Sequence, residues 1–269
     1  MRLPRRLRYG DTATLTEHLD ELRSRLIVSL IAIGVAFGVA YAFRHPLLEA
    51  LRRPLGDNVP TPPGATSSTL YTFGVAENFM TSFMVSMYAA VAVALPIIVW
   101  QIWAFLAPAF AEKDQKMIAR LGIFGTFLFV GGLLFSYFVV LPAATPFLIN
   151  FDQSEYTNLL RARDYYSFVG ITSLAVGIVF ELPILILALV RIRVLTAARL
   201  RRNWRIGIVM CVALAVLLPG VDPITTAFES LPLIALYFMS VYLATYFEKR
   251  WTRERASVPA TEAPGTGTG

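Results

Sequence analysis

Long uncharged, apolar stretches alternate with short charged segments along the whole chain. Five stretches contain no Asp, Glu, Lys or Arg: residues 26–43, 78–111, 121–151, 206–221 and 230–247. A sixth stretch, residues 165–190, contains a single glutamate. A helix needs about 20 apolar residues to cross the roughly 30 Å hydrocarbon core of a bilayer. The pattern therefore predicts an all-α membrane protein with six transmembrane helices, and it leaves no room for a separate soluble domain.

Prolines predict where some of these helices end. The third span is expected to stop at Pro142, because proline cannot continue the hydrogen-bonding pattern of a helix. The fifth and sixth spans are predicted to be short. Residues 206–218 are followed by the turn PGVDP, and Pro232 is expected to delay the start of the final helix. Such short helices would thin the bilayer locally or sit shallow in it.

The second uncharged stretch, residues 78–111, is too long for one straight span. Pro96 is expected to kink this helix. Near its end, Trp100, Trp103 and Phe105 are predicted to form an aromatic belt at the cytoplasmic face of the membrane.

The ends of the chain differ in character from the spans. Residues 1–13 form a basic arm, and residues 252–269, rich in Pro, Gly, Thr and Ala, are predicted to be a disordered tail. Between them, residues 14–251 are expected to form the six-span membrane domain. Its first part, TLTEHLDELRSRL (residues 14–26), carries leucines at helical spacing opposite acidic residues, which predicts an amphipathic helix running into the first span.

Charge and composition support this topology. The 269 residues are 56% hydrophobic and 16% charged, with a mean hydropathy of +0.60, whereas soluble domains carry about 25% charged residues. The formal charge of +6 could suggest a nucleic-acid ligand, but the basic residues alternate between compartments. Of the 24 Lys and Arg, 19 lie in the segments expected on the side of the two termini and 5 on the other. This is the positive-inside pattern, and it predicts that both termini are cytoplasmic.

The residues for catalysis or cofactor binding are missing from the predicted spans. The two histidines, His18 and His45, both lie outside them, and no HExxH or GxxxxGK[ST] motif occurs. Cys211 is the one cysteine and has no partner for a disulfide within the chain. We therefore expect neither an enzyme nor a cofactor or metal site.

One acidic residue interrupts the fourth span. In VGIVFELPILIL (residues 176–187), Glu181 is followed two positions later by Pro183. An acid at the centre of a transmembrane helix costs about 2.5–3.5 kcal/mol on insertion scales, so such residues usually face a bundle interior or a wet cavity and have a function. Pro183 removes the donor to the Val179 carbonyl and is expected to kink the helix. The alternative is a protonated Glu181 bonded to a neighbouring helix, with no further role.

Several motifs, in the same order along the chain, resemble those of the TatC family, the multi-span receptor subunit of the twin-arginine (Sec-independent) protein translocase. The similarity covers about residues 14–248. The motifs that carry it are HLDELRSRL (18–26), FMVSM (83–87), QIWAFLAPAF (101–110), YFVVLP (137–142), FELP (180–183) and PGVDP (219–223).

The resemblance implies a receptor in a bacterial-type inner membrane that needs no cofactor. It would bind the twin-arginine signal peptides of proteins already folded in the cytoplasm and gather single-span Tat partner subunits. Export would be driven by the proton gradient, and the receptor would associate with itself in a larger complex. The family fold also implies a concave groove.

The resemblance also implies where a signal peptide binds. Arginine pairs require carboxylates, because guanidinium groups form paired charge-assisted bonds that lysine cannot reproduce. The first candidate carboxylate is Glu21, whose alternative role is an ion pair with Arg25 one helical turn away. Candidates in the same helix and in the first cytoplasmic loop are Glu17, Asp20, Arg23, Arg25, Phe105, Glu112 and Asp114. Asp114 stands where the family commonly has glutamate, so Glu112 remains an alternative acceptor.

Four further positions match the family pattern. Glu181 and Pro183 would shape a groove that receives a partner's transmembrane helix, with Asp222 near a second partner surface, and Pro54 would shape the first external loop. The main competing hypothesis is a secondary transporter with Glu181 as its proton or ion site. Such proteins usually contain an internal repeat, and no second copy of FELPIL occurs. A purely structural scaffold would leave the cytoplasmic carboxylates unexplained.

Overall fold

The structure is a computed structural model that describes residues 15–56, 70–106, 115–150, 159–191, 194–218 and 223–256. Most described residues are helical; the rest form turns, short loop segments and an isolated bridge between Tyr71 and Arg161. The helices are α1 (Leu15–Ala42), α2 (Arg44–Arg52), η1 (Arg53–Leu55), α3 (Glu77–Leu106), α4 (Gln115–Phe135), the π-helical η4 (Ser136–Val140), α5 (Leu141–Asn150), α6 (Ala162–Val179), α7 (Leu182–Arg191), α8 (Ala197–Arg202), α9 (Trp204–Leu217) and α10 (Pro223–Ala256).

Five segments among the described residues are long and apolar enough to cross a membrane. They are His18–Ala42, Glu77–Phe105, Gly122–Asn150, Ala162–Arg191 and Thr225–Lys249. The remaining predicted span, the fifth (residues 206–221), corresponds to α9, an apolar helix of 14 residues, which is about 21 Å long at 1.5 Å per residue. The predicted multi-pass helical membrane protein is confirmed, and the predicted short fifth span agrees with α9.

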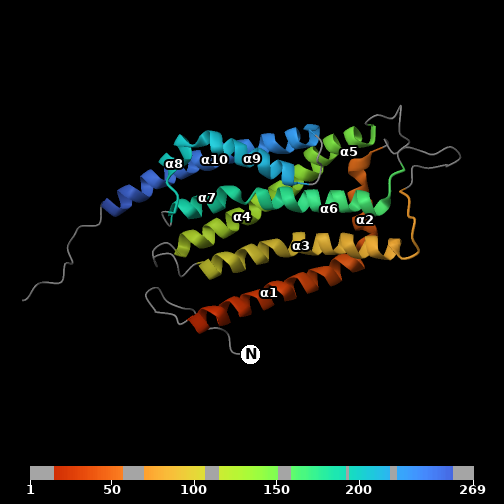
Figure 1. Cartoon of the computed structure of the whole chain (residues 1–269). Coiled ribbons are helices and arrows are strands. Elements are labelled where there is room, and N and C mark those ends of the chain that lie inside the picture. Colours follow the sequence, from red (N-terminus) through yellow and green to blue (C-terminus); the bar gives the residue numbers. More distant parts are fainter. Residues whose placement is uncertain are drawn as a thin grey trace, which may run out of the picture.

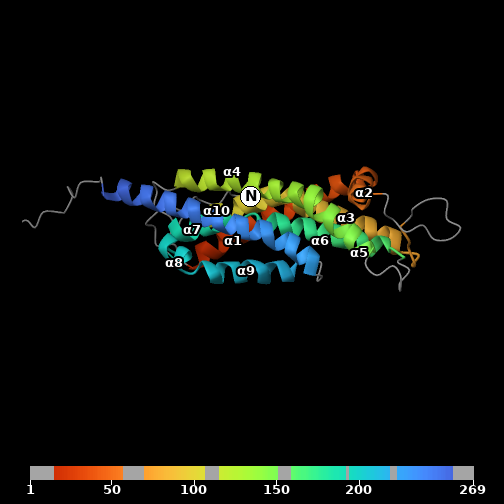
Figure 2. The ribbon, with the colours of Figure 1, turned by 90° about the horizontal axis from the view of Figure 1, so that it is seen from above.

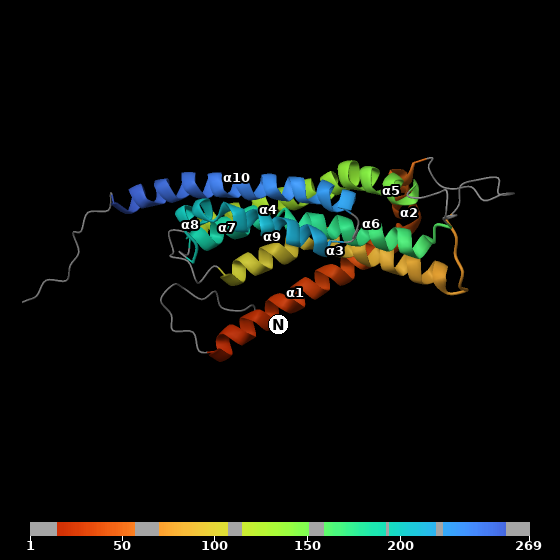
Figure 3. The same ribbon diagram turned by 45° about the horizontal axis from the view of Figure 1, so that its top comes forward.

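The helices lie side by side in an elongated bundle (Figure 1). Helix α1 is outermost and packs on α3, and α3 in turn contacts α4 and α6. On the other side of the bundle α10 packs against α7 and α9 (Figures 2 and 3). The order from one side to the other is therefore α1, α3, the α4–α6–α7 centre, and the α9–α10 pair.

The third span does not end at Pro142 as predicted. Helix α4 passes into the π-helical segment η4, where the Leu141 N–H donates to the Ser136 carbonyl, and α5 then continues to Asn150. Pro142 is the second residue of α5. Proline is tolerated in the first turn of a helix, where its missing N–H costs no intrahelical bond. The π-helical segment thus lets the chain incorporate the proline and extend the span.

The prediction of a short sixth span is also wrong. Helix α10 begins at Pro223, has 34 residues, and contains Pro232 within it. Pro223 starts the helix at the position that proline favours, so the helix is established before Pro232 is reached. The helix also continues through Ala256, into the segment predicted to be a tail.

The prediction of an aromatic belt is wrong for Trp103 and stays a prediction for Trp100 and Phe105. Trp100 is 46% exposed, but Trp103 is 7% exposed and packs against Ile184 and Ala188 of α7. Trp103 is therefore a core residue that joins α3 to α7. Pro96 lies inside α3, which continues on both sides of it.

Tyrosine hydroxyls tie α2 to η4 and α6, and an ion pair joins the residue before α6 to the start of α3. Tyr137, Tyr165 and Tyr166 donate to carbonyls near the end of α2, with O···O distances of 2.7, 2.8 and 3.2 Å. The Ala50 carbonyl also accepts from the Arg53 N–H at the end of α2, so the tyrosine hydroxyls add to the bonds of the helix itself and fix α2 against η4 and α6. Arg161 donates to Glu77 over 2.6 and 3.2 Å, and this hydrogen bonding to Glu77 raises the pKa of the Arg161 guanidinium.

Helix α1, in contrast, has no buried side chain in its described part. Gly34 and Gly38 form a GxxxG pattern, which suits close helix packing. A Cβ added at either glycine would meet no atom within 4 Å, so these glycines make no close helix contact among the described residues. Helix α1 is held mainly by its seam with α3.

Candidate functional site

Glu21 and Arg25 lie where the start of α1 meets the end of α3, and the predicted pair between them is present. The Arg25 Nε donates to Glu21 Oε1 at 3.0 Å, and a second guanidinium nitrogen contacts the same oxygen. Arg25 also reaches across to Gln101 Oε1 of α3 at 3.3 Å. Glu21 Oε2 has no hydrogen-bond partner among the described residues. A buried acceptor without a partner costs free energy, so this oxygen is suited to a donor from a ligand.

An aromatic contact lies beside this cluster. The rings of His18 and Phe105 stack with centroids 4.5 Å apart and an interplanar angle of 22°. His18 precedes Arg25 by seven residues on α1, and Phe105 follows Gln101 by one turn on α3. We call Glu21, Arg25, Gln101, His18 and Phe105 the α1–α3 polar cluster. Sequence reasoning identified three of these residues, but it assigned no role to His18 or Gln101, although both lie in the quoted motifs.

Other residues predicted for this site lie apart from the cluster or outside the described structure. Asp20 and Arg23 are exposed on other faces of α1. The side chain of Glu17 lies outside the described structure, as do Glu112 and Asp114, which fall between α3 and α4 in the sequence. The choice between the last two as a second acceptor stays a prediction.

The fourth span is broken at Glu181. Helix α6 ends at Val179 and α7 begins at Leu182. The Glu181 N–H donates to Ile178 O at 3.0 Å, while the Glu181 carbonyl accepts from the N–H groups of Ile184 and Leu185, each at 3.1 Å. Pro183, which is fully buried, is the second residue of α7. Pro183 was predicted to kink this helix; the structure has a break between α6 and α7, with Glu181 at the junction.

The side chain of Glu181 points toward α4. A Cβ built on Gly125 would lie 2.7 Å from Glu181 Oε2 and 3.2 Å from Ile184 Cδ1. The absence of a side chain at Gly125 thus provides the space for this carboxylate between α4 and α7. Glu181 Oε1 is buried and has no hydrogen-bond partner among the described residues. Glu181 is therefore a half-buried acceptor at a helix break.

A second buried carboxylic acid was missed by the sequence analysis. Glu229 of α10 is 1% exposed and lines a small cavity of about 10 Å³ with Val179, Phe180 and Pro232. It lies within the span Thr225–Lys249, so Glu181 is not the sole ionisable residue in the spans. Glu229 directly precedes the uncharged stretch of residues 230–247, and this could have indicated its place in the span. Because Pro232 was expected to delay the start of the final helix, Glu229 was placed outside that helix.

Two further predicted residues lie away from these sites. Pro54 belongs to the single turn η1, which ends at Gly56 with a φ of 59°. This left-handed conformation favours glycine, so the two residues together define the turn after α2. Asp222 lies outside the described residues. No group of three or more His, Cys, Asp or Glu that could hold a metal occurs among the residues the structure describes.

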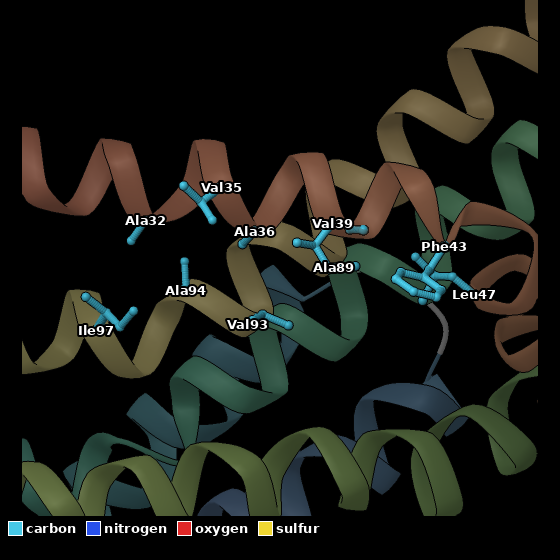
Figure 4. Close-up of a pocket in the computed structure, with 11 residues that line it drawn as sticks. Ala32, Val35, Ala36, Val39, Phe43, Leu47, Ala89, Val93, Ala94 and Ile97 are labelled. Atoms are coloured by element: carbon cyan, nitrogen blue, oxygen red, sulfur yellow. The ribbon is translucent and has the colours of Figure 1, made fainter.

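A cavity of about 550 Å³ continues the α1–α3 seam beyond the polar cluster. Figure 4 shows its lining residues, which are all apolar. The α1 side contributes Ala32, Ala36 and Val39, and the α3 side contributes Ala89 and Val93. We call this cavity the α1–α3 groove. Glu181 does not line it, so the concave groove expected around Glu181 stays a prediction.

Comparison with known proteins gives a consistent result. The family model "Sec-independent protein translocase protein (TatC)" matches residues 17–232. The Sec-independent protein translocase protein TatC of Deinococcus radiodurans is 35% identical over 245 residues, which cover 88% of this chain and 87% of that protein. The TatC protein of Carboxydothermus hydrogenoformans is 32% identical over 244 residues, covering 90% and 97%.

The fold agrees with a solved structure of the same kind. A crystal structure of the twin arginine translocase receptor TatC in DDM superimposes with a TM-score of 0.71 at 32% identity. The match covers 84% of this chain and 99% of that chain. The order of motifs, the helical architecture and these similarities lead to one conclusion, that the chain belongs to the TatC family of Sec-independent protein translocase proteins.

Proposed function

We propose that this chain is the receptor subunit of the translocase and binds the twin-arginine signal peptides of folded proteins at the α1–α3 polar cluster. Family membership makes the chain a component of the Tat translocase and a multi-pass inner-membrane protein. The proposal that this chain binds signal peptides is supported by the hydrogen bonding of Glu21. Its Oε1 accepts from Arg25, while its Oε2 has no hydrogen-bond partner among the described residues.

The chemistry of the cluster suits a guanidinium group. Arginine presents several N–H donors in a planar fork and forms charge-assisted bonds with carboxylates, whereas lysine is a point charge with a different geometry. Glu21 Oε2 and the Gln101 side-chain oxygen are acceptors at the α1–α3 junction. The stacked rings of His18 and Phe105 offer an aromatic face beside them, and arginine stacks on such faces. Two arginines would thus meet carboxylate, amide and aromatic groups at one junction.

The proposed orientation places this cluster in the cytoplasm. In a six-span topology with α9 as the fifth span, the excess of Lys and Arg falls on the side of both termini, which the positive-inside rule assigns to the cytoplasm. The cluster lies near the start of α1 and the end of α3, which are on that same side. Signal peptides of proteins folded in the cytoplasm would therefore reach it directly.

The direct test is peptide binding by the full chain in lipid nanodiscs. A signal peptide with paired arginines is expected to bind at least about tenfold more tightly than the same peptide with paired lysines, since one charge-assisted bond contributes about 1.5–3 kcal/mol. Isothermal titration or fluorescence anisotropy measures both affinities. Equal affinity for the two peptides would rule out the receptor proposal and favour an ion-coupled role for Glu181.

We further propose that Glu181 receives a polar group from the transmembrane helix of a single-span Tat partner subunit. Its support is the half-buried carboxylate at the helix break, with one oxygen lacking a hydrogen-bond partner among the described residues. An acceptor in hydrocarbon gains from a donor on a neighbouring helix, by about 0.6–2 kcal/mol in membrane proteins. Assembly with such partners would complete the exporting complex, with the proton gradient as its energy source.

Gly125→Ala is expected to weaken this partner association severalfold. The added Cβ would lie 2.7 Å from Glu181 Oε2, so the carboxylate must leave its position between α4 and α7. Co-purification of the single-span partners with the tagged chain measures the effect. The control is Gly131→Ala on the same helix, where an added Cβ meets no atom within 4 Å. If the two variants co-purify with equal amounts of the single-span partners, the proposal that Glu181 contacts a partner helix is wrong.

A further inference from the structure

We propose that the α1–α3 groove holds the acyl chains of one phospholipid from the membrane leaflet on the side of α2. The groove is a cavity of about 550 Å³ with an entirely apolar lining between α1 and α3 (Figure 4). This inference goes beyond the proposed function, because it concerns a different ligand at the opposite end of α1 from the α1–α3 polar cluster. In the proposed orientation this leaflet is the outer one.

The groove has the length of one leaflet. Charged residues bound the apolar part of α1 at Arg25 and Arg44, and the stretch between them is uncharged. Within this stretch the groove lining extends from Ala32 to Phe43, which is about 16 Å at 1.5 Å per residue. A single leaflet contributes about 15 Å to a hydrocarbon core of roughly 30 Å. An acyl chain that starts at the Arg44 end would therefore fill the groove and end near the middle of the membrane.

The width of the groove suits hydrocarbon chains better than a transmembrane helix. Including its open side, the space between the lining side chains is about 1060 Å³. Spread over a length of about 16 Å, this volume gives a mean cross-section of about 66 Å². An α-helix with its side chains is at least about 10 Å across and occupies about 80 Å². Two hydrocarbon chains, each about 4–5 Å wide from the contact distances of carbon atoms, occupy about 25–40 Å². The groove thus accommodates the two chains of one phospholipid.

The lining leaves apolar surface for these chains on both helices. Val35 and Val39 of α1 are 65% and 56% exposed, and Val93 of α3 is 69% exposed. Ala36 lies between the two valines in the sequence, and its short side chain leaves room between the helices. A chain in the groove gains dispersion contacts from both sides, whereas lipid on the outer face of α1 gains them from one. The groove is therefore expected to retain lipid that the rest of the surface exchanges.

Polar groups at the end of the groove mark the level of the lipid headgroups. Arg44 lies between Phe43 and Leu47, which both line the groove. Its Nη1 donates to the Tyr41 carbonyl at 3.3 Å, and its guanidinium carbon lies 5.0 Å from the centre of the Tyr41 ring. Tyrosine favours the membrane–water interface. Arginine has five N–H donors, so Arg44 keeps donors for a phosphate in addition to this bond.

Charge also sets the direction of the lipid. The segment of α2 and η1 carries Arg44, Arg52 and Arg53 against one acid, Glu49, so its net charge attracts an anionic headgroup. At the other end of the groove, the nearest charged residues of α1 are the paired Arg25 and Glu21, whose charges offset each other. The phosphate therefore belongs at the α2 end and the chain ends at the middle of the bundle.

Photolabelling of the full chain in lipid nanodiscs tests this inference. The probe is a phospholipid with a diazirine on its acyl chain, either near the headgroup or near the chain end, and mass spectrometry locates the labelled residues. The first probe is expected to label around Phe43 and the second around Ala32 and Ile97. The comparison site is Phe127 of α4, which is 70% exposed and does not line the groove.

The label distribution can contradict the inference in three ways. Labelling in proportion to exposure over the whole apolar surface would show ordinary contact with the bilayer. The reverse order of the two probes would show a lipid from the other leaflet. Absence of label from the groove, with the same segments covered by a partner helix or by a second copy of this chain, would assign the groove to protein.

Two variants measure retention of the lipid directly. Ala36→Trp fills the groove and is expected to remove one phospholipid from the protein in native mass spectrometry after mild extraction. Its matched control is Leu30→Trp, at a position that is 58% exposed on α1 and outside the groove. Arg44→Gln, which leaves the groove open, is expected to weaken retention of an anionic phospholipid about fivefold, with Arg53→Gln as its control.

Equal lipid retention by Ala36→Trp and Leu30→Trp would overturn the inference, and so would equal retention by Arg44→Gln and Arg53→Gln. Thermal stability of each variant is measured in the same preparation, so that loss of lipid is distinguished from loss of the fold. None of these measurements uses a signal peptide. Failure of the lipid assignment therefore leaves the receptor proposal standing, and failure of the receptor proposal leaves the lipid assignment standing.

Discussion

Glu21→Gln is expected to reduce export of a folded reporter carrying a twin-arginine signal by at least about tenfold, while the protein still inserts in the membrane. Glutamine keeps the size of the side chain but removes the charge that a guanidinium requires. A hydrogen bond to a charged group contributes about 1.5–3 kcal/mol, which corresponds to about a tenfold to hundredfold change in binding. Export of the reporter and the amount of inserted receptor are measured in the same cells.

The ion pair between Glu21 and Arg25 requires its own control. If Glu21 only stabilises α1 through this pair, then Arg25→Gln should reproduce the effect of Glu21→Gln, and neither should alter the preference for arginine. A receptor role predicts that Glu21→Gln alone abolishes the difference between arginine and lysine signals. Glu49→Gln, an exposed glutamate of α2, tests the substitution at a remote position. Normal export by Glu21→Gln would exclude this residue from recognition.

Gly132→Ala is expected to lower the thermal stability of the purified protein and to impair export. An added Cβ would lie 2.8 Å from Phe180 Cγ and 2.9 Å from Gly177 Cα. The second of these atoms belongs to the backbone of α6, so α4 and α6 must separate. Overpacking of this kind costs about 1–3 kcal/mol. The displaced residues lie beside the helix break, so Glu181 would move with Phe180.

The neighbouring glycine provides the comparison. An added Cβ at Gly131 meets no atom within 4 Å, and alanine favours a helix over glycine by up to about 1 kcal/mol. Gly131→Ala is therefore expected to keep or slightly raise stability. The midpoint of thermal aggregation in detergent measures both variants. Similar midpoints for the two would show that the α4–α6 contact at Gly132 contributes little to the fold.

The sequence was sufficient to predict those features that depend on local pattern. The lengths of the uncharged segments predicted the positions of the spans. The four-residue spacing of Glu21 and Arg25 predicted the ion pair between them. Pro183, two positions after Glu181, predicted a kink in the fourth span, where the structure has a break between two helices. Each of these follows from backbone geometry or from transfer into hydrocarbon, which act on neighbouring residues and need no knowledge of packing.

The remaining features depend on contacts between helices distant in sequence. Trp103 has the sequence context of a belt residue, but α7 packs over it. Pro142 has the context of a helix end, but the π-helical segment before it permits the helix to continue. Glu229 has the context of a loop residue, but an early helix start at Pro223 brings it into the span. Gln101 became a candidate only when its contact with Arg25 was seen.

The one-sided packing of α1 on α3 has a consequence in terms of thermodynamic linkage. With no buried side chain in its described part, α1 relies mainly on its seam with α3 to stay in place. A ligand that binds both sides of that seam stabilises the docked arrangement by an amount that grows with ligand concentration relative to its dissociation constant. Reciprocally, any partner that favours docking of α1 raises the affinity for the ligand by the same factor. The position of one helix could thus report to the rest of an assembly whether a substrate is bound.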